Sequence, residues 1–173
     1  MAGFRDEIEE RIQKYGDRYG LAIRGELGFG WDGIVFSTRL PITVVGSRLG
    51  SAIKGFRHER LYQRERDVYL RLQAHSVNRV GCFNVPELIR CDDELWIVEM
   101  SIVSPPFVLD FAGAYLDQAP DYPADVMSDW LAEKQEQFGE RWSEVAGVMT
   151  AFRHWGVWLA DVKPGNVEFA EER

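Results

Sequence analysis

The chain has 173 residues, of which 46% are hydrophobic, and its formal net charge is −8. This length and composition suit one domain with a buried core. Because no charged-then-apolar leader or membrane-length apolar run is visible, we expect a soluble, cytoplasmic protein with no membrane partner. The acidic balance argues against nucleic acid as a partner, since sequence-independent binding depends on many Lys and Arg contacts to phosphates. Cys82 and Cys91 are too few and too far apart in the sequence to predict a disulfide scaffold or a zinc site.

The first predicted element is an amphipathic helix over residues 4–18, because apolar side chains recur there at helical spacing. From residue 21 the pattern changes to short apolar runs interrupted by glycine, which favours two strands joined by a glycine-rich turn. The turn contains Gly28, Gly30 and Gly33. Glycine at such positions lets the backbone approach a phosphate chain closely and point N–H groups at it. A dinucleotide-binding fold would need a helix directly after the turn, but the β-branched and aromatic residues there predict an antiparallel strand.

Residues 42–45 and 51–56 are predicted to be strands, and residues 57–75 a helix. One face of this helix carries Glu65 among apolar side chains. A carboxylate in such a place is costly unless it is paired, and Lys54 at the end of the preceding strand is the nearest candidate partner. Glu59 is the competing choice on the same helix. Considered alone, Lys54 also fits a sheet-edge residue that points to water.

Two further strands are predicted at residues 84–90 and 95–100, and alone they fit a plain hairpin as well. Pro105-Pro106 then breaks the chain, and the apolar stretch Phe107 to Leu116 is expected to be helical. Helices are also predicted at residues 129–138 and 140–155, the second with an apolar face.

Near its end the chain brings a carboxylate, an ammonium and an amide into one short loop between apolar segments: Asp161, Lys163 and Asn166. Phosphoryl transfer uses such a set. The carboxylate can accept the proton of an attacking hydroxyl, the ammonium can neutralise charge on the moving phosphoryl group, and the amide oxygen can bind a divalent metal. A plain Pro-Gly turn between a helix and a strand is the alternative interpretation.

The glycine-rich turn, Lys54, Glu65, the apolar strand ending in Glu99-Met100 and the Asp161 loop resemble, in this order, the motifs of the protein-kinase-like superfamily. The resemblance implies an α+β fold, with a five-stranded antiparallel sheet and one helix in the small lobe, followed by a small, truncated helical lobe. It implies a single kinase-like domain over 1–173, with the sheet-rich lobe at about 1–100 and the helical lobe at about 101–173.

The resemblance also assigns roles to individual residues, with ATP and Mg²⁺ as cofactors. It places the phosphates at Gly28, Gly30, Gly33 and Lys54, with Glu65 as the partner of the lysine; the adenine ring between Val35, Ala52 and Val98; and the adenine edge at the backbone of Glu99 and Ser101. In the loop, Asp161 would act as base or metal ligand, Lys163 would stabilise charge, and Asn166 would hold magnesium, with help from Glu168.

Two features depart from the family. Leu159-Ala160 replaces the usual His-Arg before the catalytic Asp, and no Asp-Phe-Gly follows before Arg173, so Glu168, Glu171 or Glu172 would have to replace that metal ligand. Two hypotheses result: a minimal ATP-dependent phosphotransferase whose acceptor, a protein or a small molecule, is not named by the sequence, or a catalytically silent nucleotide- or partner-binding module. A homo-oligomer is compatible with both.

Overall fold

The computed structural model describes residues 3–39 and 50–170. The strand predicted at 42–45 and the candidate metal ligands Glu171 and Glu172 lie outside these residues. The chain forms two compact units, the first from residues up to Tyr69 together with Pro86–Ile102, and the second from Leu70–Val85 together with residues from Val103 onward. Among the described residues, no helix has the length and apolar character needed to span a membrane.

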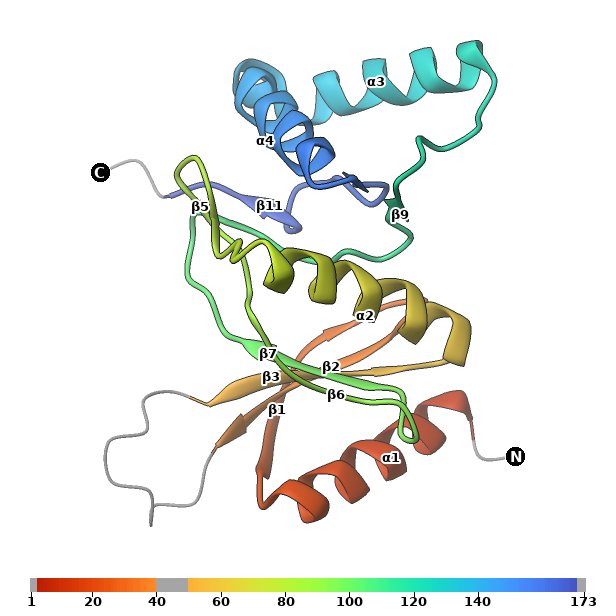
Figure 1. The fold of residues 1–173 in the computed structure, drawn as a ribbon, viewed down its shortest axis with the longest axis vertical. Helices are drawn as coiled ribbons and strands as arrows, with labels where there is room; N and C mark the ends of the chain where they lie inside the picture. Colours follow the sequence, from red (N-terminus) through yellow and green to blue (C-terminus); the bar gives the residue numbers. More distant parts are fainter. Residues whose placement is uncertain (1–2, 40–49, 171–173) are drawn as a thin grey trace. The chain divides into compact units, whose positions relative to one another are not determined.

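The first unit is built on a five-stranded antiparallel sheet, which confirms that prediction (Figure 1). The sheet has the order β1-β2-β3-β7-β6. Its strands are β1 (Ala22–Phe29), β2 (Gly33–Arg39), β3 (Ser51–Phe56), β6 (Leu88–Asp92) and β7 (Ile97–Ser101). Helix α1 (Phe4–Tyr19) precedes the sheet, and α2 (Glu59–Ala74) begins in the first unit and ends in the second.

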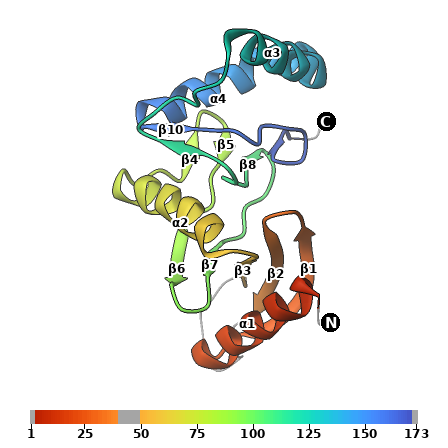
Figure 2. The same ribbon diagram turned by 90° about the vertical axis from the view of Figure 1, so that its right-hand side faces the viewer.

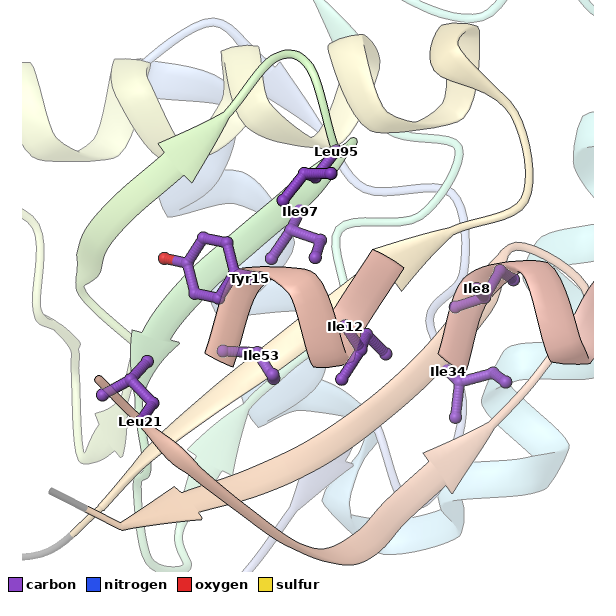
Figure 3. Packing of buried hydrophobic residues seen from close by; sticks show 8 residues of the cluster. All are labelled: Ile8, Ile12, Tyr15, Leu21, Ile34, Ile53, Leu95 and Ile97. Atoms are coloured by element: carbon purple, nitrogen blue, oxygen red, sulfur yellow. The ribbon is translucent and has the colours of Figure 1, made fainter. Parts of the chain in front are cut away.

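Helix α1 covers one face of the sheet, as its amphipathic pattern predicts. Figure 3 shows the apolar cluster that it forms with the strands. The buried members of the cluster are Ile8, Ile12, Tyr15, Leu21, Ile34, Ile53, Leu95 and Ile97. Because successive residues of a strand point to opposite faces, Ile53 faces α1 while its neighbour Lys54 faces α2. The two faces of the sheet therefore differ: one packs against α1 in the apolar cluster, and the other carries the ion pair of Lys54 with Glu65 of α2.

The second unit combines short strands with the end of α2 and the helices α3 and α4 (Figure 2). A four-stranded sheet has the order β11-β8-β5-β4, and β10 pairs with β9. The elements are β4 (Arg79–Val80), β5 (Phe83–Asn84), β8 (Phe107–Val108), β9 (Tyr115–Leu116), α3 (Ala124–Phe138), the 3₁₀ turn η1 (Gly139–Arg141), α4 (Trp142–His154), β10 (Val157–Trp158) and β11 (Val167–Glu168).

Both helices predicted in this part of the chain are confirmed, but the helix expected at Phe107 to Leu116 is wrong. This stretch forms β8 and β9, which belong to different sheets. Between the two strands, Asp110 and Gly113 have φ values of 60° and 67°. Left-handed residues at these positions interrupt any continuous right-handed helix.

Candidate functional site

The glycine-rich segment is the connection between β1 and β2, which run side by side in Figure 2. The Gly30 N–H donates to the carbonyl oxygen of Gly33 at 3.0 Å, which closes a four-residue turn. Trp31 lies in this turn and is 77% exposed. The sequence prediction of two antiparallel strands around a tight glycine turn is confirmed.

The three glycines of this turn differ in what surrounds them. A Cβ atom on Gly33 would lie 2.1 Å from the carbonyl oxygen of Gly55 in β3, so the fold itself requires glycine there. A Cβ on Gly28 or Gly30 would meet no atom within 4 Å. Because the fold leaves space at these two positions, they are the glycines that a bound phosphate chain could use.

This difference gives the first testable prediction. Gly33→Ala should destabilise the fold by about 3 kcal/mol, because the new methyl group overlaps the β3 backbone. Gly28→Ala should change stability by only about 0.5 kcal/mol. Under the predicted phosphate role of the turn, it should also weaken ATP binding roughly tenfold, about 1.4 kcal/mol, because the methyl group obstructs close approach of phosphates. Urea denaturation and calorimetric titration with ATP check the two effects. Equal ATP affinity of wild type and Gly28→Ala would contradict a phosphate site here.

Side chains at the start of α1 contact the hairpin of β1 and β2. The rings of Phe4 and Phe29 stack with their centroids 5.9 Å apart, and Arg5 forms an ion pair with Glu26 of β1 at 2.5 Å. The guanidinium of Arg57 lies 4.4 Å from the Phe4 ring centroid. The sequence analysis did not identify these residues, because only the fold brings the chain start and the end of β3 to the hairpin.

Lys54 and Glu65 form the ion pair that the sequence predicts. The Lys54 Nζ lies 2.7 Å from Oε2 of Glu65. Both residues are buried, with 6% and 2% of their surfaces exposed. The competing candidate Glu59 is exposed in the first turn of α2. The position of Glu65 on the apolar face of its helix therefore selected the correct carboxylate.

The residues expected around an adenine ring share the sheet face of Lys54. Val35 of β2 and Val98 of β7 lie directly beside Lys54 in the register of the sheet, and Ala52 lies two residues before it on the same strand. Residues directly opposite one another, or two apart, point to the same face. Val98 and Ala52 are buried, and Val35 is half-buried. These three side chains and Lys54 thus line one face of the sheet.

Glu99 and Ser101, whose backbone groups were predicted to pair with an adenine edge, both lie in β7. The Ser101 N–H donates to the carbonyl oxygen of Glu87 at 2.9 Å, so an adenine edge would have to displace this bond. Glu99 is paired in the sheet with Ile53 of β3 and Arg90 of β6. The backbone role of these two residues stays a prediction.

The side chain of Glu99 points to the α1 face and forms a buried polar group there. It accepts hydrogen bonds from the Tyr15 hydroxyl at 2.7 Å and from the Ser51 hydroxyl at 2.6 Å. Burial, together with the Glu99 carboxylate, raises the pKa of the Tyr15 phenol well above its usual value. The carboxylate therefore helps to hold α1 on the sheet, which the sequence did not indicate.

In the second unit, the loop after β10 brings its three predicted residues together. The Lys163 Nζ lies 2.7 Å from Oδ2 of Asp161, and the Asn166 side-chain nitrogen donates to the same oxygen at 3.0 Å. It also donates to the Asp161 carbonyl oxygen at 2.9 Å. Because its nitrogen faces Asp161, the amide oxygen of Asn166 is the atom left to bind a cation.

The Asp161 loop is anchored at its downstream end by backbone contacts. Val167 pairs with Val108 between β11 and β8, and the Leu109 N–H donates to the Asn166 carbonyl oxygen at 2.7 Å. Glu168 is exposed on β11. Within residues 3–39 and 50–170, no group of three or more His, Cys, Asp or Glu side chains lies together as a metal site. The residues that suit magnesium here are Asp161 and Asn166, which offer the oxygen ligands that this ion prefers.

Comparison with protein-family models finds no matching family, and comparison with curated proteins finds no match. The chemistry of the chain is therefore inferred from two groups of residues. One is the sheet face of Lys54 with the glycine hairpin, in the first unit. The other is the Asp161 loop, in the second unit.

Proposed function

We propose that the chain has a protein-kinase-like fold and binds ATP, with the phosphates at Gly28, Gly30 and Lys54. The observation that carries this proposal is the buried ion pair of Lys54 and Glu65. It lies on the sheet face that also carries the apolar side chains Val35, Ala52 and Val98. Burying two charges costs several kcal/mol per ion, so a buried pair is weak evidence for stability. A nucleotide site would explain why the pair is buried, because Glu65 then holds the Lys54 ammonium in position for charge-assisted hydrogen bonds to phosphate oxygens.

The same proposal includes phosphoryl transfer in a minimal form. Asp161 accepts the proton of the attacking hydroxyl, and Lys163, whose ammonium contacts that carboxylate, places positive charge beside the reacting group. Asn166 orients Asp161 through its side-chain nitrogen and offers its oxygen to Mg²⁺. Magnesium, when bound, would neutralise charge on the phosphates. The acceptor is a hydroxyl-bearing protein or small molecule.

The second candidate function is a catalytically silent nucleotide- or partner-binding module. It is favoured by the small number of oxygen ligands around Asp161. The Asp161 carboxylate is contacted by the side-chain nitrogens of Lys163 and Asn166, and Glu168 is exposed on β11. In this function Lys54 and Glu65 keep their roles, while the Asp161 loop is a structural turn.

Calorimetric titration of the wild-type chain with ATP, ADP and GTP, each with and without Mg²⁺, tests the proposal. We expect saturable binding of one ATP per chain, strengthened by Mg²⁺ if Asp161 and Asn166 bind the metal. Absence of binding by every adenine and guanine nucleotide would overturn the proposed function. A crystal soaked with ATP and Mg²⁺ then separates the two candidates, because only the phosphotransferase needs a carboxylate close to the γ-phosphate or its metal.

A further inference from the structure

Arg71, near the end of α2, forms a forked contact with Asp117, directly after β9. Its Nη1 lies 2.8 Å from Oδ1 of Asp117, and its Nη2 lies 2.8 Å from Oδ2. Nη1 also donates to the carbonyl oxygen of Trp155 at 2.9 Å. All three residues belong to the second unit. The planar guanidinium matches both carboxylate oxygens at once, so the contact fixes orientation as well as distance.

The chain just before β10 is shaped around this contact. Gly156 has a φ of 73°, and its carbonyl oxygen accepts a hydrogen bond from the Asp117 N–H at 2.8 Å. A Cβ atom on Gly156 would lie 2.5 Å from Oδ1 of Asp117 and 2.6 Å from Nη1 of Arg71. Any other residue would therefore have to displace the ends of the Asp117 and Arg71 side chains, and it would take an unfavourable backbone conformation. We call the contact group formed by Gly156, the Asp117 carboxylate and the Arg71 guanidinium the Arg71 anchor.

The Arg71 anchor lies at the upstream end of the segment that carries Asp161. From Gly156 the chain passes through β10, whose two residues pair with β9, and reaches Asp161 five residues later. The downstream end has more support, because β11 pairs with β8 within the four-stranded sheet and the Leu109 N–H donates to the Asn166 carbonyl oxygen at 2.7 Å. A pairing of two residues gives little rigidity by itself. The Arg71 anchor supplies the remaining constraint, since it ties the end of α4 to the chain that follows β9.

We propose that Arg71 and Asp117 are positioning residues for Asp161, which they hold through Gly156 and β10. This inference rests on the proposed function, in which Asp161 is the base or a metal ligand. Positioning matters because a displacement of about 1 Å at a reacting group can cost roughly a hundredfold in rate.

A contribution to global stability does not explain the Arg71 anchor. The side chain of Asp117 is 65% exposed, and that of Arg71 28%. Ion pairs of this exposure add little to the free energy of unfolding. The pKa of the Asp117 carboxyl is lowered, first by its hydrogen bond with Arg71, so the pair is charged at neutral pH. Removing the contact should loosen one segment and leave the rest of the fold unchanged.

The experiment compares Arg71→Lys and Asp117→Asn with Arg60→Lys. Arg60 is an exposed residue of the same helix, so Arg60→Lys is the matched control. Lysine keeps the charge but loses the fork, and asparagine keeps the shape but loses the charge. The first measurement is amide hydrogen exchange. We expect exchange over residues 157–166 to become at least about tenfold faster in both variants, with no change in β1–β3. The double variant should show no further increase, because both changes remove one contact.

The second measurement tests the proposed role of Asp161. It is the Mg²⁺ factor, defined as the ratio of the ATP affinity with Mg²⁺ to the ATP affinity without it. This factor should fall in Arg71→Lys and Asp117→Asn and stay at the wild-type value in Arg60→Lys, because only the first two displace Asp161. A merely structural contact would not change it.

Exchange over residues 157–166 that is as slow in Arg71→Lys as in Arg60→Lys would overturn the inference. So would an unchanged Mg²⁺ factor together with faster exchange, because the contact would then be structural only. If the wild type binds no nucleotide, the proposed function fails and the inference, which rests on it, fails too. Faster exchange in that case would mark the Arg71 anchor as a purely local brace, so the two failures are distinguishable.

Discussion

Lys54→Met is expected to weaken ATP binding roughly tenfold to a hundredfold, because it removes the proposed charge-assisted hydrogen bonds to phosphate, of about 1.5–3 kcal/mol, at nearly constant volume. The same change removes the Lys54 ammonium from beside the buried Glu65 carboxylate. Breaking a buried pair in this way typically costs about 3–5 kcal/mol of stability. Calorimetric titration with ATP measures the first effect, and urea denaturation the second.

The double variant Lys54→Met with Glu65→Leu separates binding from stability. Replacing both members of a buried pair by apolar side chains is often neutral or stabilising, so this chain should regain most of the lost stability. It should not regain ATP affinity, since the Lys54 ammonium proposed to contact the phosphates is still missing. Arg60→Met removes an exposed positive charge from the same unit and serves as the control. A folded double variant that binds ATP as tightly as wild type would show that Lys54 does not contact the nucleotide.

Asp161→Asn should lower turnover by about a hundredfold to ten-thousandfold, the range that a positioned general base contributes. ATP affinity should stay nearly unchanged, because the carboxylate acts on the transition state. Asn166→Ala should also lower turnover, and it should require more Mg²⁺ for half-maximal rate, since it removes the proposed metal ligand as well as the hydrogen bond to Asp161. Single-turnover phosphoryl transfer and ATP titration at several Mg²⁺ concentrations measure these effects.

The control for both changes is Asp129→Asn, which removes an exposed carboxylate from α3 in the same unit. It should leave turnover and ATP affinity at wild-type values. Equal turnover of Asp161→Asn and Asp129→Asn would exclude Asp161 as the base. A Mg²⁺-ATP complex in which no carboxylate approaches the γ-phosphate or its metal would favour the silent module.

Local patterns in the sequence determined most elements of the first unit. The helical spacing of Ile8 and Ile12 predicted α1, because a helix buries one stripe of side chains. The glycines and β-branched residues around Gly33 predicted the hairpin. Glu65 was identified correctly because a carboxylate on a buried helix face needs a partner, and Lys54 was the nearest cation. Asp161 and Asn166 could be predicted to lie close together because they are only five positions apart in one short loop.

The tertiary structure decided the features that depend on residues far apart in the sequence. Only the approach of β3 showed that Gly33 is required by the fold while Gly28 has open space. The stretch from Phe107 to Leu116 forms two strands because β8 pairs with β11 and β9 pairs with β10. Pairing with a distant strand depends on tertiary context and cannot be recognised from the local sequence.

The Arg71 anchor could not be predicted for the same reason. In the sequence, Arg71 resembles any solvated arginine on a helix, and only the fold places a carboxylate and a carbonyl oxygen around it. The sequence by itself thus determined which residues carry charge and where the chain bends. The tertiary structure decided which of those charges face each other, because contacts between distant residues depend on the packing of whole elements and not on their spacing along the chain.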